Sequence, residues 1–400
     1  MRSTVTAVIA AAAAASAAAA ASAAAAPSLP AAYEGRLVRV EVGATVCNAF
    51  AYGAVGDGRA DDTAALQRAL TACANGGTAY LPANGTFLSF GISASSASNF
   101  ALRIDGTLRF SNATKSWPKG SSACIDIAGS GVAVVGHGLV DGQGAAWWPC
   151  AKAGCARPNL LNAHVEGAGL LIANVTFVDS PNHNLELYAS PQEVFNATVL
   201  APDSANVPVP SHNTDGIDVH GSPALIHECH ISVGDDHVAM HANDTLVERC
   251  RFGTGHGASI GSLGADTFLQ NITVRDSSFD GAATAMRIKA DTTSSGFLRQ
   301  VTYANLTLKD CATTLLVLEN YPSGGESKST LAISDVLVTD VAASGAVQAA
   351  GAVNCSASAP CERMTVQRVT HASKPKDGWV CEFAHGTAQG DEPALGCLQP

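Results

Sequence analysis

The sequence predicts an all-β fold, a right-handed parallel β-helix (solenoid) with a short N-terminal capping helix. Three observations predict it: short β-branched segments recur, glycine and turn residues separate them, and helical periodicity is nearly absent. Each repeat is too small to bury its own apolar face, so the repeats must stack. A β-propeller is the alternative, but its blades usually need longer repeats and more aromatic residues than the 6% present here.

The first segment, residues 1–26, is expected to be a signal peptide, and residues 33–400 a single β-helix catalytic domain. An early Arg2, a long run of small apolar residues and several Ala-x-Ala sites precede Pro27, which is typical of a secretory leader. A low-complexity alanine tract is the alternative. No basic flank follows the run, and no other stretch is long and apolar enough to cross a bilayer, so we expect no membrane association.

The clearest helical stretch covers residues 61–74. Aspartates open it, and an Asn-Gly-Gly sequence closes it. We expect this helix to cover the open end of the solenoid, where bare strand edges would otherwise be exposed.

The repeat unit is about twenty to thirty-odd residues long. Successive β-branched segments align with steps of 22, 33, 21, 21, 34 and 30 residues. The aligned positions are Asn174, Asn196, Cys229, Cys250, Asn271, Asn305 and Asp335.

The composition limits which partners the protein can bind and indicates the redox compartment in which it folds. The formal net charge is −11 and the chain has no run of lysine or arginine, so we expect no nucleic-acid partner. The 12 cysteines are an even number, as a disulfide framework in a secreted protein requires. Spacing suggests the pairs Cys150–Cys155, Cys355–Cys361, Cys381–Cys397 and Cys47–Cys73, and leaves Cys124, Cys229, Cys250 and Cys311 as small buried side chains.

The chain also contains eight Asn-x-Ser/Thr sequons. In a secreted eukaryotic protein some would carry glycans, whereas those inside β-rich runs would be structural asparagines. The sequons begin at Asn84, Asn112, Asn174, Asn196, Asn243, Asn271, Asn305 and Asn354.

The first candidate site residues are aspartates whose carboxylates are expected to lie close enough to repel one another. Asp235 and Asp236 are adjacent, and Asp215 precedes Asp235 by 20 residues in a chain with only 14% charged residues. Adjacent carboxylates repel one another unless a proton, a cation or a salt bridge compensates them. Taken alone, Asp215 could be a turn residue and the Asp235–Asp236 pair could bind calcium.

Stacking brings further polar residues onto the same face. Residues one coil apart lie on strands about 5 Å apart, and His256 follows Asp236 by 20 residues. Arg287 and Lys289 follow His256 after 31 and 33 residues, close to the longer repeat, and Tyr321 comes 32 residues after Lys289. We therefore expect all of them on one face, although His256 alone could be a core histidine and the two cations a solvated face.

The motifs "HNTDG" (212–216), "GDDHVAM" (234–240), "GTGHGASIGSLG" (253–264), "RIK" (287–289) and Tyr321 resemble, in order and spacing, the motif series of the polygalacturonase family of glycoside hydrolases. The N-terminal segments "CNAFAYGAVGDGRADDTAALQRAL" and "DGQGAAWW" resemble that family too. The resemblance covers residues 45–325. It implies a hydrolase of polygalacturonate or pectin that inverts the anomeric configuration.

The resemblance also implies a role for each site residue. Asp235 would be the general acid, and Asp215 and Asp236 would hold and activate the attacking water. His256 would tune the proton of the acid. The implied substrate-binding residues are Asn213, Gly257, Arg287, Lys289 and Tyr321, with the two cations reading the carboxylate of a galacturonate unit.

Two details of the motifs bear on geometry. Neighbouring strand residues point to opposite faces, so Asp235 and Asp236 can act together only if a turn or bulge breaks the alternation, which Gly234 favours.

Many members of the family carry a cysteine after the GDD motif that is bonded to another before GHG. Here both cysteines are missing, and His237 stands at the first position. His237 could shift the pKa of Asp236 or simply fill space, which we favour.

We therefore expect the protein to be a monomeric, secreted enzyme that acts outside the cell or in the cell wall. Its expected substrate is an acidic polysaccharide. No cofactor and no metal are expected. The alternatives are a related β-helix pectinase on a branched, rhamnogalacturonan-type pectin, a pectate lyase that uses calcium, and a non-catalytic β-helix that binds wall polysaccharide. Endo or exo action stays open, because loops around the site decide it.

Overall fold

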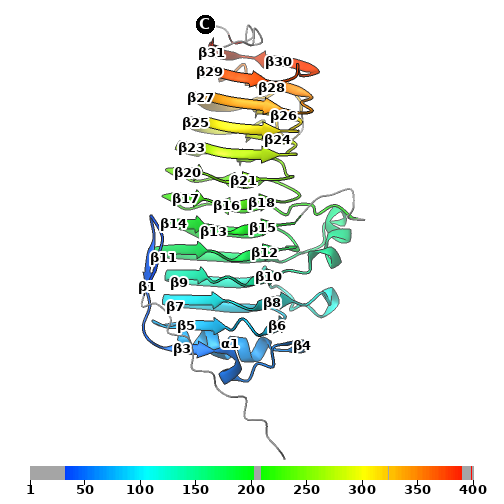
Figure 1. Cartoon of the computed structure of the whole chain (residues 1–400). Helices are drawn as coiled ribbons and strands as arrows, with labels where there is room; N and C mark the ends of the chain where they lie inside the picture. Colours follow the sequence, from blue (N-terminus) through cyan, green and yellow to red (C-terminus); the bar gives the residue numbers. More distant parts are fainter. Residues whose placement is uncertain (1–31, 202–208, 323, 390–397, 399–400) are drawn as a thin grey trace, which may run out of the picture.

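The computed structural model describes residues 32–201, 209–322, 324–389 and 398. The chain winds into a right-handed parallel β-helix whose coils lie on one another from the N-terminal to the C-terminal end (Figure 1). The named strands of these described ranges pair in parallel, apart from one N-terminal hairpin. The predicted all-β class and parallel β-helix are confirmed, and the propeller alternative is wrong.

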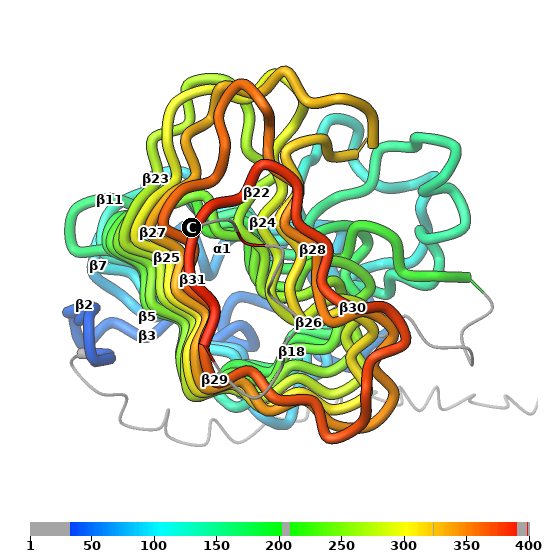
Figure 2. The backbone as a smooth tube through the Cα atoms, turned by 90° about the horizontal axis from the view of Figure 1, so that it is seen from above, coloured from blue at the N-terminus to red at the C-terminus, as the bar shows by residue number. Residues whose placement is uncertain are grey.

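Strand pairing builds three stacks that run the length of the molecule, and seen along the axis their coils superpose (Figure 2). The first stack contains β13 (Leu185–Ala189), β16 (Ile217–Val219), β19 (Val238–Met240), β22 (Ala258–Leu263), β24 (Thr284–Ala290), β26 (Thr313–Leu318), β28 (Ala349–Asn354) and β30 (Asp377–Glu382). The second contains β3 (Val46–Asn48), β5 (Thr78–Leu81), β14 (Gln192–Phe195), β17 (Ala224–His227), β20 (Thr245–Glu248) and β31 (Ala384–Gln389). The third contains β4 (Asp57–Asp61), β6 (Thr86–Ser89), β8 (Thr107–Phe110), β10 (Leu139–Asp141), β12 (Thr176–Val178), β15 (Thr198–Leu200), β18 (His230–Ser232) and β21 (Arg251–Phe252).

Long strands bend from one stack into the next. Those that join the first and second stacks are β7 (Ile92–Ile104), β9 (Ala123–Val135) and β11 (Asn159–Ala173). Those that join the second and third are β23 (Thr267–Asp280), β25 (Ser295–Lys309), β27 (Thr330–Ser344) and β29 (Cys361–His371). Short 3₁₀ segments lie in the loops: η1 (Ala49–Tyr52), η2 (Thr114–Ser116), η3 (Gly144–Ala146) and η4 (Trp148–Ala153).

The alternating residues of the first stack decide which side chains face outward. Ile217 and Val219 on β16 belong to the hydrophobic core, and Asp218 between them points to the other side. The same holds for Met286 and Ile288 around Arg287 on β24. Strict alternation along a strand therefore places one polar column on the outer face of this stack.

The repeat is real, but the sequence alignment of its units is wrong in detail. Phe195 pairs with His227, so Asn196 lies beside Glu228 rather than Cys229. The residues that share this turn adopt left-handed φ values, for which Asn and Asp are well suited. The column consists of Asn174, Asn196, Glu228, Arg249, Asp276, Asn305 and Asp340.

Two aligned positions belong to a different turn. Asn271 and Asp335 are left-handed residues of a second column, five positions earlier on their strands. Asparagine side chains also connect coils, since Asn196 Nδ2 donates to Asn174 Oδ1 at 2.8 Å. Asparagines in the β-rich sequons therefore have a structural role, which was one of the two interpretations given for the sequons above; the other was glycan attachment.

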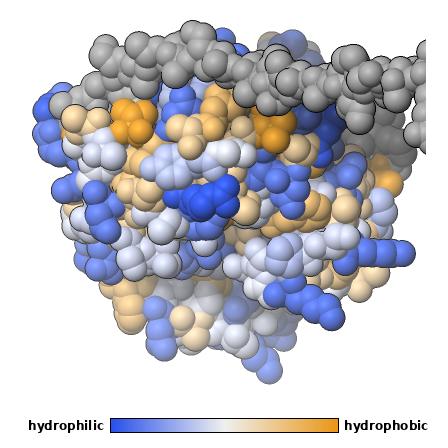
Figure 3. All heavy atoms as spheres, turned by 90° about the horizontal axis from the view of Figure 1, so that it is seen from below, coloured by the Kyte–Doolittle hydropathy of each residue, from blue (hydrophilic) through white to orange (hydrophobic). Residues whose placement is uncertain are grey.

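The predicted helix is α1 (Thr63–Cys73), at the N-terminal end of the stack (Figure 1). It buries an apolar face that includes Leu66 and Leu70, and it packs on β5 and β7. Asp62 does not cap the helix with its side chain; its carboxylate accepts hydrogen bonds from the backbone of Val55 and Gly56 at 2.6 and 3.1 Å. Seen from this end, the described surface mixes hydrophilic and hydrophobic residues (Figure 3), as expected for a covered end.

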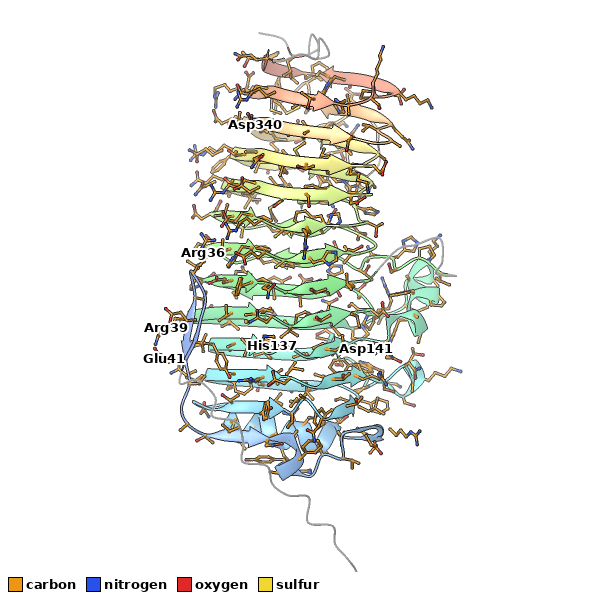
Figure 4. The ribbon with its side chains drawn as sticks, viewed as in Figure 1. Arg36, Arg39, Glu41, His137, Asp141 and Asp340 are labelled. Atoms are coloured by element: carbon orange, nitrogen blue, oxygen red, sulfur yellow. A yellow bond between two sulfur atoms is a disulfide. The ribbon has the colours of Figure 1, made fainter. Side chains whose placement is uncertain are left out.

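One element was not foreseen. β1 (Ala32–Glu34) and β2 (Arg39–Glu41) form an antiparallel hairpin that lies along the outside of the coils, where Arg36, Arg39 and Glu41 are visible (Figure 4). Its buried Val38 and Val40 cover a second, smaller hydrophobic cluster on the second stack. The β-helix itself therefore begins after this hairpin, and the expected signal peptide lies outside the described residues.

The disulfide expectations are mostly confirmed. Three of the four proposed pairs are bonded, namely Cys47–Cys73, Cys150–Cys155 and Cys355–Cys361. Cys397, the expected partner of Cys381, lies outside the described residues. The remaining four cysteines are buried and free, as predicted: Cys124, Cys229, Cys250 and Cys311. Within the described ranges we find no helix long and apolar enough to span a bilayer.

Candidate active site

The candidate acidic residues lie in turns that lead into the first stack. Asp215 stands just before β16, Asp235 and Asp236 stand in the turn between β18 and β19, and His256 stands just before β22. Because 234–237 is not strand, side-chain alternation does not apply there and both aspartates can serve one site. The expected break in the alternation is confirmed.

The register of the coils corrects one expected pairing. Ile217 pairs with Val238, and Val238 pairs with Ala258. Counting back two residues places Asp215 beside Asp236, not beside Asp235. Asp235 stands one residue out of this column, where His256 reaches it.

Asp236 is the most buried member of the group, with 1% of its surface exposed. Its Oδ1 accepts a hydrogen bond from Ser259 Oγ at 2.6 Å and lies 3.3 Å from Arg287 Nη1. Its Oδ2 accepts from Lys289 Nζ at 2.5 Å. Both cations assigned to the substrate by the sequence therefore contact a carboxylate of the site itself.

Asp235 forms a pair with His256, whose Nδ1 lies 3.0 Å from Asp235 Oδ1. Burial raises the pKa of Asp235, but the hydrogen bond and charge of His256, together with the charge of Lys289, outweigh burial and lower it. The hydrogen bond to Asp235 raises the pKa of His256 above its ordinary value. Both pKa shifts favour an ion pair between an ionised Asp235 and a protonated His256.

Asp215 lies in the opposite electrostatic situation. Burial and the negative charge of Asp218 raise its pKa well above the ordinary value, and the charge of His183 offsets only part of this rise. Its Oδ1 has no hydrogen-bond partner and lies 3.5 Å from His183 Nε2. The surroundings of Asp215 therefore disfavour its charged form, in contrast to those of Asp235.

A neighbouring cluster was missed by sequence reasoning. His183 Nδ1 donates to Glu186 Oε2 at 2.8 Å and lies 3.3 Å from Asp218 Oδ2, an ion-pair contact without hydrogen-bond geometry. Burial would lower the pKa of His183, but contacts with Asp218 and Glu186 and the charge of Asp215 raise it to about 11. The available signal was an acidic residue between two apolar ones, in "LEL" and again in "IDV".

Tyr321 lies against both cations. Its ring centroid is 5.2 Å from Arg287 Cζ and 5.3 Å from Lys289 Nζ, within the range of cation–π contacts. Arg287 Nε is buried and has no hydrogen-bond partner. The fully buried Tyr303 supports the strand from inside, since its hydroxyl contacts the backbone carbonyl of Arg287 at 3.3 Å.

Two other predicted residues stand at the edge of the site. Asn213 is exposed, has a left-handed φ of 52°, and its Oδ1 lies 3.4 Å from Arg157 Nη2. Gly257 is buried, and a Cβ there would come within 2.4 Å of the Thr284 carbonyl oxygen. Close packing of the next coil explains this glycine, so its substrate contact stays a prediction. Arg157, which sequence reasoning missed, also donates to the His212 carbonyl at 2.7 Å.

His237 packs into the core between two turns, which is the role that we favoured for it from the sequence. It is fully buried, and its Nε2 lies 3.0 Å from the carbonyl oxygens of both Gly253 and Thr254. Its ring packs against Phe252 and Phe279, at centroid distances of 5.1 and 5.9 Å, and burial lowers its pKa to about 4. These hydrogen bonds join the two turns that the missing cysteine pair would have cross-linked.

The described residues do not favour a metal at the aspartates. Ligand atoms of Asp235, Asp236 and His256 lie within 4.8 Å of one another. However, Asp236 already accepts from Ser259 and two cations, and Asp235 from His256. A divalent cation would have to displace these donors and approach Lys289, so the calcium interpretation is disfavoured.

Comparison with known proteins gives a consistent result. The family model described as glycosyl hydrolases family 28 matches residues 77–390, and one described as rhamnogalacturonase A/epimerase, pectate lyase-like, matches residues 46–93. A polygalacturonase of Prunus persica is 28% identical over 372 residues, which cover 88% of this chain and 93% of the relative. An endo-polygalacturonase of Pectobacterium carotovorum is 29% identical over 296 residues, with coverages of 64% and 71%.

The fold has solved counterparts. The crystal structure of an exopolygalacturonase from Thermotoga maritima matches with a TM-score of 0.76 at 19% identity, covering 88% of this chain and 93% of the other. This likeness concerns the architecture of the β-helix.

Proposed function

The chain belongs to family 28 of the glycosyl hydrolases, and from this we propose that it hydrolyses α-1,4-galacturonosyl linkages in polygalacturonate and pectin. The observation that carries the proposal is the arrangement of Asp215, Asp235 and Asp236 in adjacent turns, beside two cations and a histidine. Relatives described as polygalacturonases support the substrate class. The enzyme is a glycoside hydrolase, and its substrate is a polysaccharide.

Asp235 is the proposed general acid. Its hydrogen bond with His256 supports this role because the raised pKa of the imidazole favours a proton held within the pair. When the glycosidic oxygen approaches Asp235, the proton moves from imidazole to carboxylate and then to the leaving oxygen. The proton that the attacking water loses passes through the base to solvent, and His256 regains a proton from solvent for the next turnover.

Asp215 and Asp236 are the proposed pair that holds the attacking water. Asp236 is anchored by Ser259, Arg287 and Lys289, so its orientation is fixed before substrate binds. Asp215 Oδ1 is buried and has no hydrogen-bond partner among the described residues, so a water enclosed beside it would satisfy it. Attack by a water, rather than by a carboxylate, inverts the anomeric configuration.

Arg287, Lys289 and Tyr321 are the proposed site for one galacturonate unit, with Asn213 and Gly257 at its margin. The unpartnered Arg287 Nε supports this, because it is a buried donor that a substrate carboxylate can satisfy. We further propose that the protein is secreted as a monomer, without cofactor, and acts in the cell wall. Its disulfides fit an oxidising compartment.

The test is incubation with polygalacturonate while reducing ends and the absorbance of unsaturated products are followed together. Reducing ends without unsaturation are the expected result. Unsaturated product would mean elimination, as in a pectate lyase, and would overturn the proposal. Tight binding without any new reducing ends would instead identify a non-catalytic wall-binding protein.

A further inference from the structure

A buried carboxylate lies two residues before Tyr321, outside the group of side chains described above. Glu319 directly follows β26 and is completely buried. Its Oε1 accepts a hydrogen bond from Ser329 Oγ at 2.8 Å, and its Oε2 accepts one from the backbone N–H of Ser356 at 2.6 Å. Burial raises the pKa of Glu319, although both hydrogen bonds lower it. The carboxylate is therefore held in place by hydrogen bonds from neutral groups.

The same residue closes the connection between β26 and β27. Ser327 Oγ donates to the backbone carbonyl of Glu319 at 2.5 Å, and Ser329 donates to its carboxylate. The end of the connection thus returns to the residue at its beginning, and Tyr321 lies between these two points. A buried polar network whose members are all paired specifies one conformation of the backbone that it joins.

The next coil also contributes to this network. Ser356, which donates to the carboxylate, directly follows Cys355, and Cys355 is bonded to Cys361. A carboxylate oxygen of Glu319 and the two sulfurs lie within 4.8 Å of one another. A metal would need thiolates as ligands, and these sulfurs are bonded to each other. The disulfide instead closes the turn that presents the Ser356 amide to Glu319.

Tyr321 depends on the position of this connection. Its backbone N–H donates to the Ala290 carbonyl at 3.0 Å, and its ring is only partly buried. The ring centroid lies 5.2 Å from Arg287 Cζ and 5.3 Å from Lys289 Nζ. Cation–π contacts act only within about 6 Å of the centroid, so a small shift of the connection would remove both contacts.

We propose that Glu319 is a positioning residue for Tyr321: it fixes the connection between β26 and β27 and thereby keeps the tyrosine ring over Arg287 and Lys289. The inference rests on the proposed function, in which these three residues bind one galacturonate unit. Glu319 does not touch the substrate and acts through Tyr321. The coil that carries Ser356 then supports substrate binding, although it follows the last of the recognised motifs.

Hydrogen exchange tests this anchor without any substrate. The backbone amides of the peptide that contains Tyr321 should exchange about tenfold faster in Glu319→Ala than in the wild type, because Ser329 and Ser356 lose their acceptor. Glu319→Gln should exchange as the wild type does, since its amide oxygen can accept from Ser356 and its amide nitrogen can donate to Ser329. Equal exchange in Glu319→Ala and the wild type would overturn the proposal.

Steady-state kinetics on polygalacturonate test whether the anchor acts through Tyr321. Glu319→Ala should raise KM about tenfold and change kcat less, as the loss of a binding contact does, and Glu319→Gln should restore the wild-type KM. Tyr321→Ala should show the same division between KM and kcat. The double variant should have the KM of Tyr321→Ala, because no ring is left to position. Additive losses in the double variant would overturn the proposal.

A second variant covers the case in which Glu319→Ala does not fold. Ser329→Ala removes only the hydroxyl that binds Oε1 and should raise KM severalfold. Ser89→Ala is the matched control, because Ser89 is equally buried and its hydroxyl lies 3.2 Å from Thr63 Oγ1, but it belongs to β6 near the N-terminal end; its KM should equal the wild-type value.

Two further outcomes separate this inference from the proposed function. A wild-type KM in Ser329→Ala and Glu319→Ala, with only a lower urea midpoint, would show that the network supports the fold alone and would overturn the inference. If the wild type releases no reducing ends from polygalacturonate, the proposed function fails, and hydrogen exchange decides whether Glu319 anchors Tyr321.

Discussion

Lys289 Nζ lies 2.5 Å from Oδ2 of Asp236, and both side chains are almost completely buried. The lysine that sequence reasoning assigned to the substrate therefore also neutralises a carboxylate of the candidate site. Under the proposed mechanism, recognition of the substrate and preparation of the acid–base group depend on the same buried charge.

Replacement of Lys289 should for this reason affect stability as well as affinity. Breaking a buried ion pair from one side costs about 3–5 kcal/mol, and we expect Lys289→Met to lower the free energy of unfolding by an amount of that order. Urea denaturation measures it. The double variant Lys289→Met/Asp236→Asn should recover most of the loss, since no charge is then left unpaired; equal destabilisation of both variants would contradict the pairing.

Asp235→Asn should reduce turnover on polygalacturonate about 100- to 10,000-fold while the protein stays folded. The amide is nearly isosteric but cannot donate a carboxyl proton. Initial rates of reducing-end release measure the effect, and far-ultraviolet circular dichroism checks the fold. Asp280→Asn is the control, because Asp280 forms only an exposed ion pair with Lys309. Near-normal turnover in folded Asp235→Asn would remove this residue from the mechanism.

Stability should fall as the pH rises above neutrality, because of His183. Its pKa is raised to about 11 in the folded protein, compared with about 6.5 in an unfolded chain. The folded state binds the proton more tightly, so the stabilisation is complete below about pH 6.5 and decreases as the pH rises toward 11.

The corresponding measurement is the urea midpoint between pH 6.5 and 9. The decrease should be clearly smaller in His183→Gln than in the wild type. His137→Gln serves as the control, because His137 is exposed and lies between β9 and β10 (Figure 4), several coils before β16 and β19, which follow the candidate aspartates. Parallel pH profiles for wild type and His183→Gln would show that the ion cluster does not hold this proton.

The anomeric configuration should invert in the first turnover. Asp215 and Asp236 lie side by side on neighbouring coils, the arrangement proposed above to hold the attacking water. Proton nuclear magnetic resonance of fresh product, recorded before mutarotation, distinguishes the two anomers. Retention would indicate a covalent intermediate and exclude the proposed water-activating role of both residues.

The sequence by itself determined the architecture and which polar residues come together at the candidate site. β-Branched segments at repeating intervals specify stacked coils, because no single coil can bury its apolar face. The polar motifs of Asp215, Asp235 and His256 recur at the same intervals, so stacking alone brings them together. Cysteine spacing likewise indicated the three disulfides described.

Only the tertiary structure decided the register and the partners. Turns that differ in length by a few residues shift the alignment of coils, so sequence spacing could not tell that Asp215 lies beside Asp236, or that Asn196 lies beside Glu228. Glu186 and Asp218 are charged residues within apolar strands. The groups that they contact can be identified only when their neighbours on the outer face of the stack are known. The pKa values of these groups depend on distances of a few ångströms and on burial, and both arise from packing between coils.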